Sequence, residues 1–393
     1  MKKSSNPKLF AVKNMTKDYV LFVNRGNLRI ARENMGLDFF AASKKITTSK
    51  RNYVKEWEEG ASLPKWSQLI KLAKAYNISE LALCSKEEIQ KNKKITDFRV
   101  EIKDDNNEKV NKLINIVSSR QRWLERKMKE DGLAKNKLVG FGRDIDDPIK
   151  LAKVVADELD FNLQNIINFS GNDAKKKALK YLTEKVESKG IFVGKTISYI
   201  KVDVEDLRGL SISNDYCPFI VINRSDSVAA QIFSLVHEVT HVFRKSDAIS
   251  NSLEFRKEQT RLDPEERICN SVAAELLLPE SEFTKPFYDR ENIYEFAEKY
   301  KASPLFVLYR MKELGKLGKG SFSELENSIR TETNRNLEEK KKLMMGKSGG
   351  SFINNMKDSN GNLFNNFVSS AYFEKKIGFI EAANLLKYSP EQA

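Results

Sequence analysis

The sequence predicts an α+β protein that is mostly helical. Apolar residues recur at helical spacing along much of its 393 residues. Short runs rich in β-forming residues gather between residues 191 and 224, where Gly, Asn, Asp and Pro separate them. Basic charge is concentrated in the first fifth of the chain. We therefore expect a helical N-terminal module, a helical bridge, a domain with a small β-sheet and a helical C-terminal extension.

Length and composition define the broad class of protein. A hydrophobic fraction of 40% and a charged fraction of 31% are typical of a soluble globular chain. No apolar run approaches the roughly 18 residues that suggest a membrane span, and the first residues lack the apolar region of a signal peptide. We expect a cytoplasmic protein without a membrane partner. Its three cysteines, Cys84, Cys217 and Cys269, form no CxxC pair, which argues against disulfides and a cysteine-built zinc site.

Chain length allows two or three domains. The expected segments are a basic tail over 1–20, an all-helical module over 21–85, a helical linker over 86–149, the sheet-containing domain over 150–318 and the extension over 319–393.

The N-terminal segment carries most of the net charge. Residues 1–76 hold 16 Lys or Arg against six Asp or Glu, and the whole chain has a net charge of +13. Such a segment suits a polyanion, because Lys and Arg displace counterions from phosphates. A solvated basic surface is the alternative. Short helices are predicted over 27–36, 37–46, 47–60 and 63–78, with Gly36 and Gly60 ending the first and third.

Trp57, Glu58, Gly60 and Pro64 close the series of short helices within residues 21–83. With this closing signature, the segment resembles the phage-repressor (XRE) type of helix-turn-helix domain, although Asp38 and its neighbours replace a customary Gln. The resemblance implies that the third helix enters the major groove of DNA. The candidate DNA contacts are Thr48, Ser49, Lys50, Arg51 and Asn52. The alternative is a basic helical bundle that binds another protein.

Further elements follow from caps and periodicity. Asp147 and Pro148 predict the start of a helix, and another is expected over 173–190. Strands are predicted over 191–197, 207–213 and 218–224, followed by a helix over 223–243 that Ser225 or Asp226 caps. The extension is expected to contain a charged helix over 323–345 and two helices within 362–387.

The only two histidines of the chain, His237 and His241, lie four residues apart on the helix predicted over 223–243. Residues four apart are stacked one turn away on a helix, so both imidazoles can point at one Zn²⁺. Glu238 stands beside the first histidine, where its carboxylate can act as a general base, and together the residues form an H-E-x-x-H motif. The alternative is a pair of ordinary hydrogen-bonded histidines.

A catalytic zinc needs a third protein ligand. A second predicted helix begins at Asp263 and Pro264 and offers Glu266, with Glu265 and Glu275 as rivals. Asn270, one turn after Glu266, is a candidate for orienting a ligating histidine. Glu266 also stands where a capping-box glutamate belongs, which is its structural alternative.

Residues 150–315 resemble the ImmA/IrrE family of bacterial metallopeptidases. A strand pair precedes the H-E-x-x-H helix, and a second signature follows it, formed by Glu266, Asn270, Ala273, Leu276, Leu277 and Pro279; Cys269 and Val272 depart mildly from the family pattern. The resemblance implies a zincin-like domain, zinc ligands His237, His241 and Glu266, and Glu238 as catalytic base. It also implies a cytoplasmic endopeptidase that cleaves a repressor-like transcription factor and so releases stress-response, mobile-element or defence genes.

Two other functions remain open from the sequence. The chain could be a DNA-binding regulator whose zincin domain senses rather than cleaves, and either form could belong to a toxin–antitoxin or phage-defence operon. For the enzyme, an edge strand within 210–223 is expected to hold an extended substrate. Tyr309 and Arg310 are candidates for stabilising the oxyanion, with helix packing as the alternative role.

Overall fold

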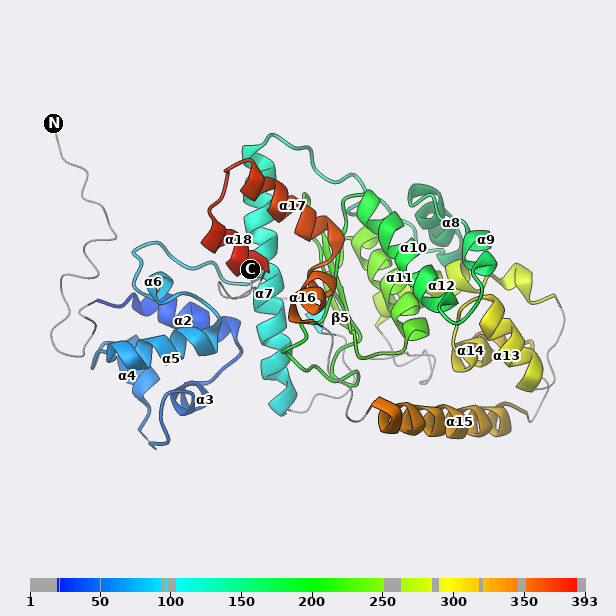
Figure 1. Ribbon diagram of the computed structural model, residues 1–393, viewed down its shortest axis with the longest axis horizontal. Helices are drawn as coiled ribbons and strands as arrows, with labels where there is room; N and C mark the ends of the chain where they lie inside the picture. The colour runs from blue at the N-terminus through cyan, green and yellow to red at the C-terminus, as the bar shows by residue number, and fades with distance from the viewer. Residues whose placement is uncertain are drawn as a thin grey trace. The chain divides into compact units, whose positions relative to one another are not determined.

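The computed structural model confirms an α+β fold that is mostly helical (Figure 1). It describes residues 20, 22–49, 51–92, 96–97, 104–250, 263–284, 290–317, 321–344 and 351–386. Lys50 and nearly all of the expected basic tail lie outside these residues. The chain divides into two compact units, one formed by residues 1–94 and 102–120 and the other by residues 95–101 and 121–393.

The first unit is built from short helices. They are α2 (Arg25–Asn34), α3 (Phe39–Lys44), α4 (Tyr53–Glu59), α5 (Trp66–Tyr76), α6 (Glu80–Leu83) and the first part of α7 (Asp104–Glu130). Asn24, Asp38 and Ser79 begin three of them by accepting a backbone N–H. The apolar faces of α2 to α6 meet in one core, in which Trp57 and Tyr76 are buried.

The residues of the closing signature stabilise this core. Trp57 is buried, and the Glu58 carboxylate accepts two hydrogen bonds from the buried Arg32 guanidinium, at 2.7 and 3.0 Å. Gly60 ends α4 in the left-handed conformation, with φ of 78°, which a side chain would strain. The signature is therefore explained by packing within the unit.

Helix α4 begins later than its sequence predicts. The helix expected over 47–60 starts six residues too early, since α4 begins at Tyr53 after the N-cap Asn52. Local side chains compete with the helix: Thr47 Oγ1 accepts from Ser49 N, and Ser49 Oγ accepts from Arg51 N. The described candidates for DNA contact therefore lie in a loop and at the helix cap.

A five-stranded mixed sheet forms the centre of the second unit. Its order is β1 (Thr96–Asp97), β5 (Ala248–Ser250), β3 (Gly209–Ile212), β4 (Phe219–Ile222) and β2 (Phe192–Lys195). β3 runs antiparallel to both of its neighbours, whereas the pairs β1–β5 and β2–β4 are parallel. The three runs predicted from the sequence form β2, β3 and β4. The expected substrate-binding edge is wrong, because β3 and β4 are internal strands whose backbones already pair on both sides.

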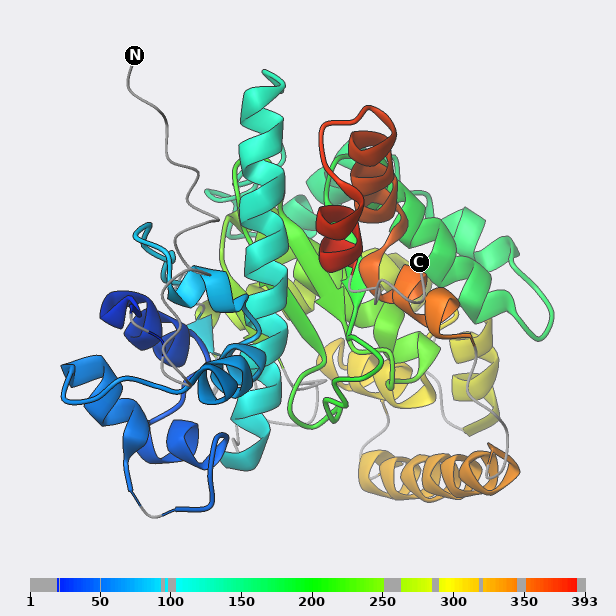
Figure 2. The same cartoon turned by 60° about the vertical axis from the view of Figure 1, so that its left-hand side comes forward.

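Both faces of the sheet are covered. On β2 and β4, Phe192 and Phe219 stack with ring centroids 5.0 Å apart, and Phe364 of α17 (Asn362–Phe373) meets Phe219 edge-on. Val193 and Ile220 point to the opposite face and join the core formed with α10 (Ala174–Ser188) and α11 (Val228–Arg244). Figures 1 and 2 show α10 and α11 on one side of the sheet and α17 on the other. Burial of both faces explains why these strands read as continuous apolar runs.

The remaining elements of this unit surround that core. They are α8 (Pro148–Glu158), α9 (Leu163–Asn168), α12 (Pro264–Leu277), the 3₁₀ turn Glu280–Glu282, α13 (Arg290–Lys299), α14 (Pro304–Glu313), α15 (Ser321–Met344), α16 (Phe352–Asn360) and α18 (Phe379–Leu386). The predicted caps Asp147 and Asp263 are confirmed. The predicted cap of α11 is wrong: Ser227 caps it, while Asp226 is ion-paired with Arg208. Among the described residues, no helix combines the length and apolar character needed to cross a bilayer.

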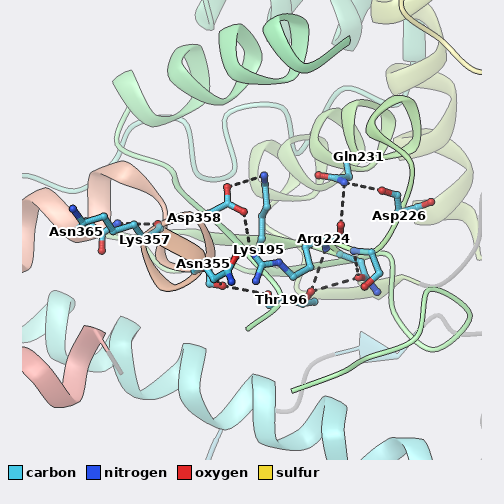
Figure 3. A network of polar contacts seen from close by, with 12 residues as sticks. Lys195, Thr196, Arg224, Asp226, Gln231, Asn355, Lys357, Asp358 and Asn365 are labelled. Carbon is cyan, nitrogen blue, oxygen red and sulfur yellow. Dashed lines mark hydrogen bonds and ion pairs between the residues drawn. The ribbon is translucent and has the colours of Figure 1, made fainter. Parts of the chain in front are cut away.

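The C-terminal extension is anchored beside the start of α11. Asp358 of α16 pairs with Lys195 of β2 and with Arg224 in the loop before α11, each at 2.8 Å (Figure 3). Gln231 of α11 contacts the same loop, where its Nε2 donates to the carbonyl of Asp226 at 2.8 Å. The extension and the sheet-containing domain are thus parts of one compact unit.

Candidate metal centre

Helix α11 carries the two histidines through the middle of the second unit. Ser227 starts it by accepting from Ala230 N, and residues 230–243 are all buried. Apolar side chains on both sides of the helix, including Val236 and Val239, hold it between the sheet and α12. A helix packed all round cannot rotate, so the histidines have a fixed orientation.

Helix α12 brings a carboxylate to the histidines. Asp263 caps it, Pro264 occupies its first turn, and Val272 and Ala273 pack in the same core as α11. This packing places Glu266, in the first turn of α12, against His237 and His241. Glu266 is only 4% exposed, which requires compensation for its buried charge.

The three side chains converge on one point. His237 Nε2 and His241 Nε2 lie 3.1 Å apart, and the Glu266 oxygens lie 3.4 Å from the first nitrogen and 2.9 Å from the second. Ligand atoms in a tetrahedral zinc site are about 3.3 Å from one another, given bonds of about 2.0 Å. Two imidazole nitrogens and one carboxylate are also the donor set of many catalytic zinc sites. The residues therefore fit a zinc ion.

The charge of the cluster agrees with a ligand role for Glu266. Burial would raise the pKa of Glu266, but the neighbouring His237 and His241 outweigh it and hold this pKa well below the ordinary value. The carboxylate is therefore ionised and able to bind a cation at neutral pH.

The two rival glutamates have other partners. Glu265 accepts from Arg244 Nε at 2.7 Å, and Glu275 is ion-paired with Arg310. Of the three carboxylates considered from the sequence, Glu266 is the one that the structure places against both histidine Nε2 atoms.

Glu238 is fully buried and packs against strand β3. A Cβ atom built on Gly209 would lie 2.8 Å from Glu238 Cγ and 2.8 Å from its Cδ, closer than real side chains approach one another. The pKa of the nearby Cys269 thiol is raised, first by burial and then by the charges of Glu266 and Glu265. The Glu238 carboxylate adds to the same effect. Gly209 thus makes the space that Glu238 occupies, a role that the sequence pattern did not reveal.

We expect Gly209→Ala to impair any activity that depends on Glu238 while leaving the metal ligands in place. The new methyl group must push aside a side chain that has no solvent to move into, at a cost of about 1–3 kcal/mol in stability. The measurements are kcat, zinc content and melting temperature, with Gly378→Ala as control, because a Cβ there meets nothing within 4 Å. Full activity of a folded Gly209→Ala protein would contradict this role.

Asn270, predicted to orient a ligating histidine, is buried one turn after Glu266 on α12. The described residues provide no hydrogen-bond partner for either of its amide atoms. The ring nitrogen of His241 that faces away from the cluster, Nδ1, instead lies 2.8 Å from Ser246 Oγ. Sequence reasoning missed Ser246, which lies just beyond the end of α11.

Tyr309 and Arg310 have packing roles. The Tyr309 hydroxyl donates to Glu326 at 2.5 Å and also accepts from Arg330. Arg310 contacts Glu275, Glu313 and the carbonyl of Leu278, which joins α14 to the end of α12. These contacts confirm the helix-packing alternative for both residues.

The candidate DNA contacts lie in the first unit. Thr48, Ser49 and Arg51 are exposed, whereas Asn52 is half-buried and its side chain caps α4. The Arg51 guanidinium donates to both oxygens of Glu56, at 2.6 and 2.7 Å. A phosphate would have to compete with this exposed ion pair.

A buried His₂Glu cluster on two helices beside a small sheet is typical of metallopeptidase domains. Residues 193–312 match the family model Peptidase M78, described as the IrrE N-terminal-like domain. The matched segment begins in β2 and ends in α14, so it contains the whole cluster and supports the resemblance to the ImmA/IrrE family. It covers under a third of the chain and leaves out the N-terminal helical unit. Neither the curated proteins nor the solved structures gave a match to this chain.

Proposed function

We propose that this protein is a zinc-dependent cytoplasmic endopeptidase with a DNA-binding domain, and that it cleaves a repressor-like transcription factor. Cleavage would switch on stress-response, mobile-element or defence genes. The observation that carries the proposal is the convergence of His237, His241 and Glu266 within a segment that matches a peptidase family. Zinc, the DNA partner and the protein substrate are all parts of this proposal.

The proposed chemistry is hydrolysis of a peptide bond. When bound by His237, His241 and Glu266, Zn²⁺ supplies Lewis acidity and lowers the pKa of a water molecule. Glu238 accepts the proton of the attacking water and returns it to the leaving amine. Its burial keeps competing bulk water away from this carboxylate. A protein that only held or sensed zinc would need the three ligands but would have no use for Glu238.

The proposal is tested with the purified full-length chain and a repressor-like protein encoded beside its own gene. Zinc-dependent cleavage of that protein, stopped by a chelator and restored by Zn²⁺, is the expected result. If zinc binds but neither this protein nor unfolded peptides are cut, the sensing function is favoured instead.

We also expect the first unit to bind DNA through its basic loop. The double variant Lys50→Ala with Arg51→Ala should weaken binding to the DNA upstream of its own gene and reduce the salt slope by about 2. A gel-shift titration at several salt concentrations measures both effects. Lys176→Ala with Lys180→Ala is the matched control, because it removes the same charge from exposed positions of α10. An equal slope in both double variants would contradict this assignment.

A further inference from the structure

The end of helix α11 turns the chain back onto one of the predicted ligands. Lys245 adopts the left-handed conformation, with φ of 56°; Lys245 N donates to the carbonyl of Val242 at 3.0 Å, and Ser246 N donates to that of His241 at 2.9 Å. These two bonds form a Schellman motif, which satisfies carbonyl groups at the helix end. The motif places Ser246 beside the same residue, His241, whose carbonyl it caps.

The Ser246 hydroxyl links this histidine to a carboxylate. Ser246 Oγ lies 2.8 Å from His241 Nδ1 and 3.2 Å from Glu265 Oε1. Glu265 is held in turn by Arg244 Nε at 2.7 Å, and the Arg244 guanidinium donates to the carbonyl of Ile145 at 2.9 Å. The Cys269 thiol also lies 3.5 Å from His241 Nδ1. The hydroxyl is the closer and stronger acceptor for a ring N–H.

We propose that Ser246 and Glu265 are positioning residues that fix His241 for metal binding. The His241 Nδ1–H donates to Ser246 Oγ, and the Ser246 O–H donates to Glu265. This direction leaves a lone pair on His241 Nε2, the atom that faces His237 and Glu266. The sequence offered Glu265 as an alternative to Glu266 for the third ligand. In the structure Glu265 instead acts on the ligand His241 through Ser246.

The size of the effect follows from other metal sites. Groups that hydrogen-bond the distal nitrogen of a ligating histidine fix its tautomer and ring orientation, and their loss typically lowers metal affinity about 10–100-fold. The proposal rests on the proposed zinc function, because it concerns the affinity of that same site.

The test compares zinc affinities, measured by chelator competition, in Ser246→Ala, Glu265→Gln and Ser246→Thr. We expect the first two to lose about 10–100-fold and the third to retain affinity near that of the unchanged protein, because threonine keeps the hydroxyl. Thr240→Val is the matched control: it removes another buried hydroxyl of α11, one that donates to the carbonyl of Val236. The melting temperature of the metal-free variants separates an effect on the site from a loss of folding.

A second readout reports the hydrogen bond itself. Because the chain has two histidines, the ring N–H signals of the zinc-loaded protein are few and can be assigned by NMR. Ser246→Ala should speed the exchange of one ring N–H proton with water and so broaden or remove its signal. Ser246→Thr should restore that signal. Unchanged affinity and an unchanged ring signal in a folded Ser246→Ala protein would overturn the inference while leaving the zinc function intact. Failure of the unchanged protein to bind zinc would overturn both.

Discussion

Replacing Glu238 with Gln should abolish peptide cleavage and leave the bound zinc in place. The amide has nearly the same size as the carboxylate, so it fits the buried space against Gly209, but it cannot accept the proton of an attacking water. General-base catalysis of this kind contributes about 10²–10⁴-fold to a rate. We therefore expect kcat to fall by at least that order, with the zinc content unchanged.

The measurement is the rate of cleavage of the repressor-like protein at saturating substrate, together with zinc content by mass spectrometry. Glu313→Gln is a suitable control, since it makes the same chemical change in a carboxylate that pairs with Arg310 away from the histidines. Equal rates for Glu238→Gln and the unchanged protein would rule out Glu238 as the base and with it the proposed mechanism.

The parts of the site that were predicted from the sequence are those fixed by local geometry. His237 and His241 needed only a helix to bring them together, and a helix is what the apolar spacing around them indicates. Predicting Glu266 as a ligand also required that α11 and α12 pack together. The H-E-x-x-H motif and the second signature that follows it supplied that information. The rivals of Glu266 could be separated from it only by their ion pairs with arginines.

The parts that escaped prediction depend on contacts between distant residues or on loop geometry. Gly209 matters because strand β3 packs closely against Glu238, and no pattern in the sequence around Gly209 predicts this contact. Ser246 matters because a left-handed lysine, rather than the glycine that usually marks such a turn, ends α11. Strands β1 and β5 are too short to show any periodicity. The start of α4 was misplaced because hydroxyl groups stabilise a turn within a polar stretch that also suits a helix.

The anchoring of the extension was also invisible in the sequence. A polar helix such as α16 would be expected to face solvent, yet Asp358 joins β2 to the loop that precedes the histidine helix. Asp358 itself is exposed, whereas the next two residues of α16, Ser359 and Asn360, are buried. Polar residues of α16 therefore help to hold β2 and the loop before α11 in place. The spacing of hydrophobic residues gives no indication of such polar contacts.

Replacing Glu266 with Ala should remove zinc from the protein. Two histidines would remain, and a site that loses one of three protein ligands falls further in affinity than one that loses only a supporting hydrogen bond, which costs about 10–100-fold. Glu266 is also the negative charge of the cluster, so its loss leaves the two imidazoles without a carboxylate beside their Nε2 atoms.

The zinc content after dialysis against a weak chelator distinguishes the three carboxylates. Glu266→Ala should retain almost none, Glu275→Ala should retain all of it because Glu275 pairs with Arg310, and Glu265→Ala should lie between them because it loosens His241 through Ser246. This order follows from where each carboxylate points rather than from its place in the sequence. Full zinc occupancy in Glu266→Ala would show that another group completes the site, and the convergence of the three side chains would then need a different explanation.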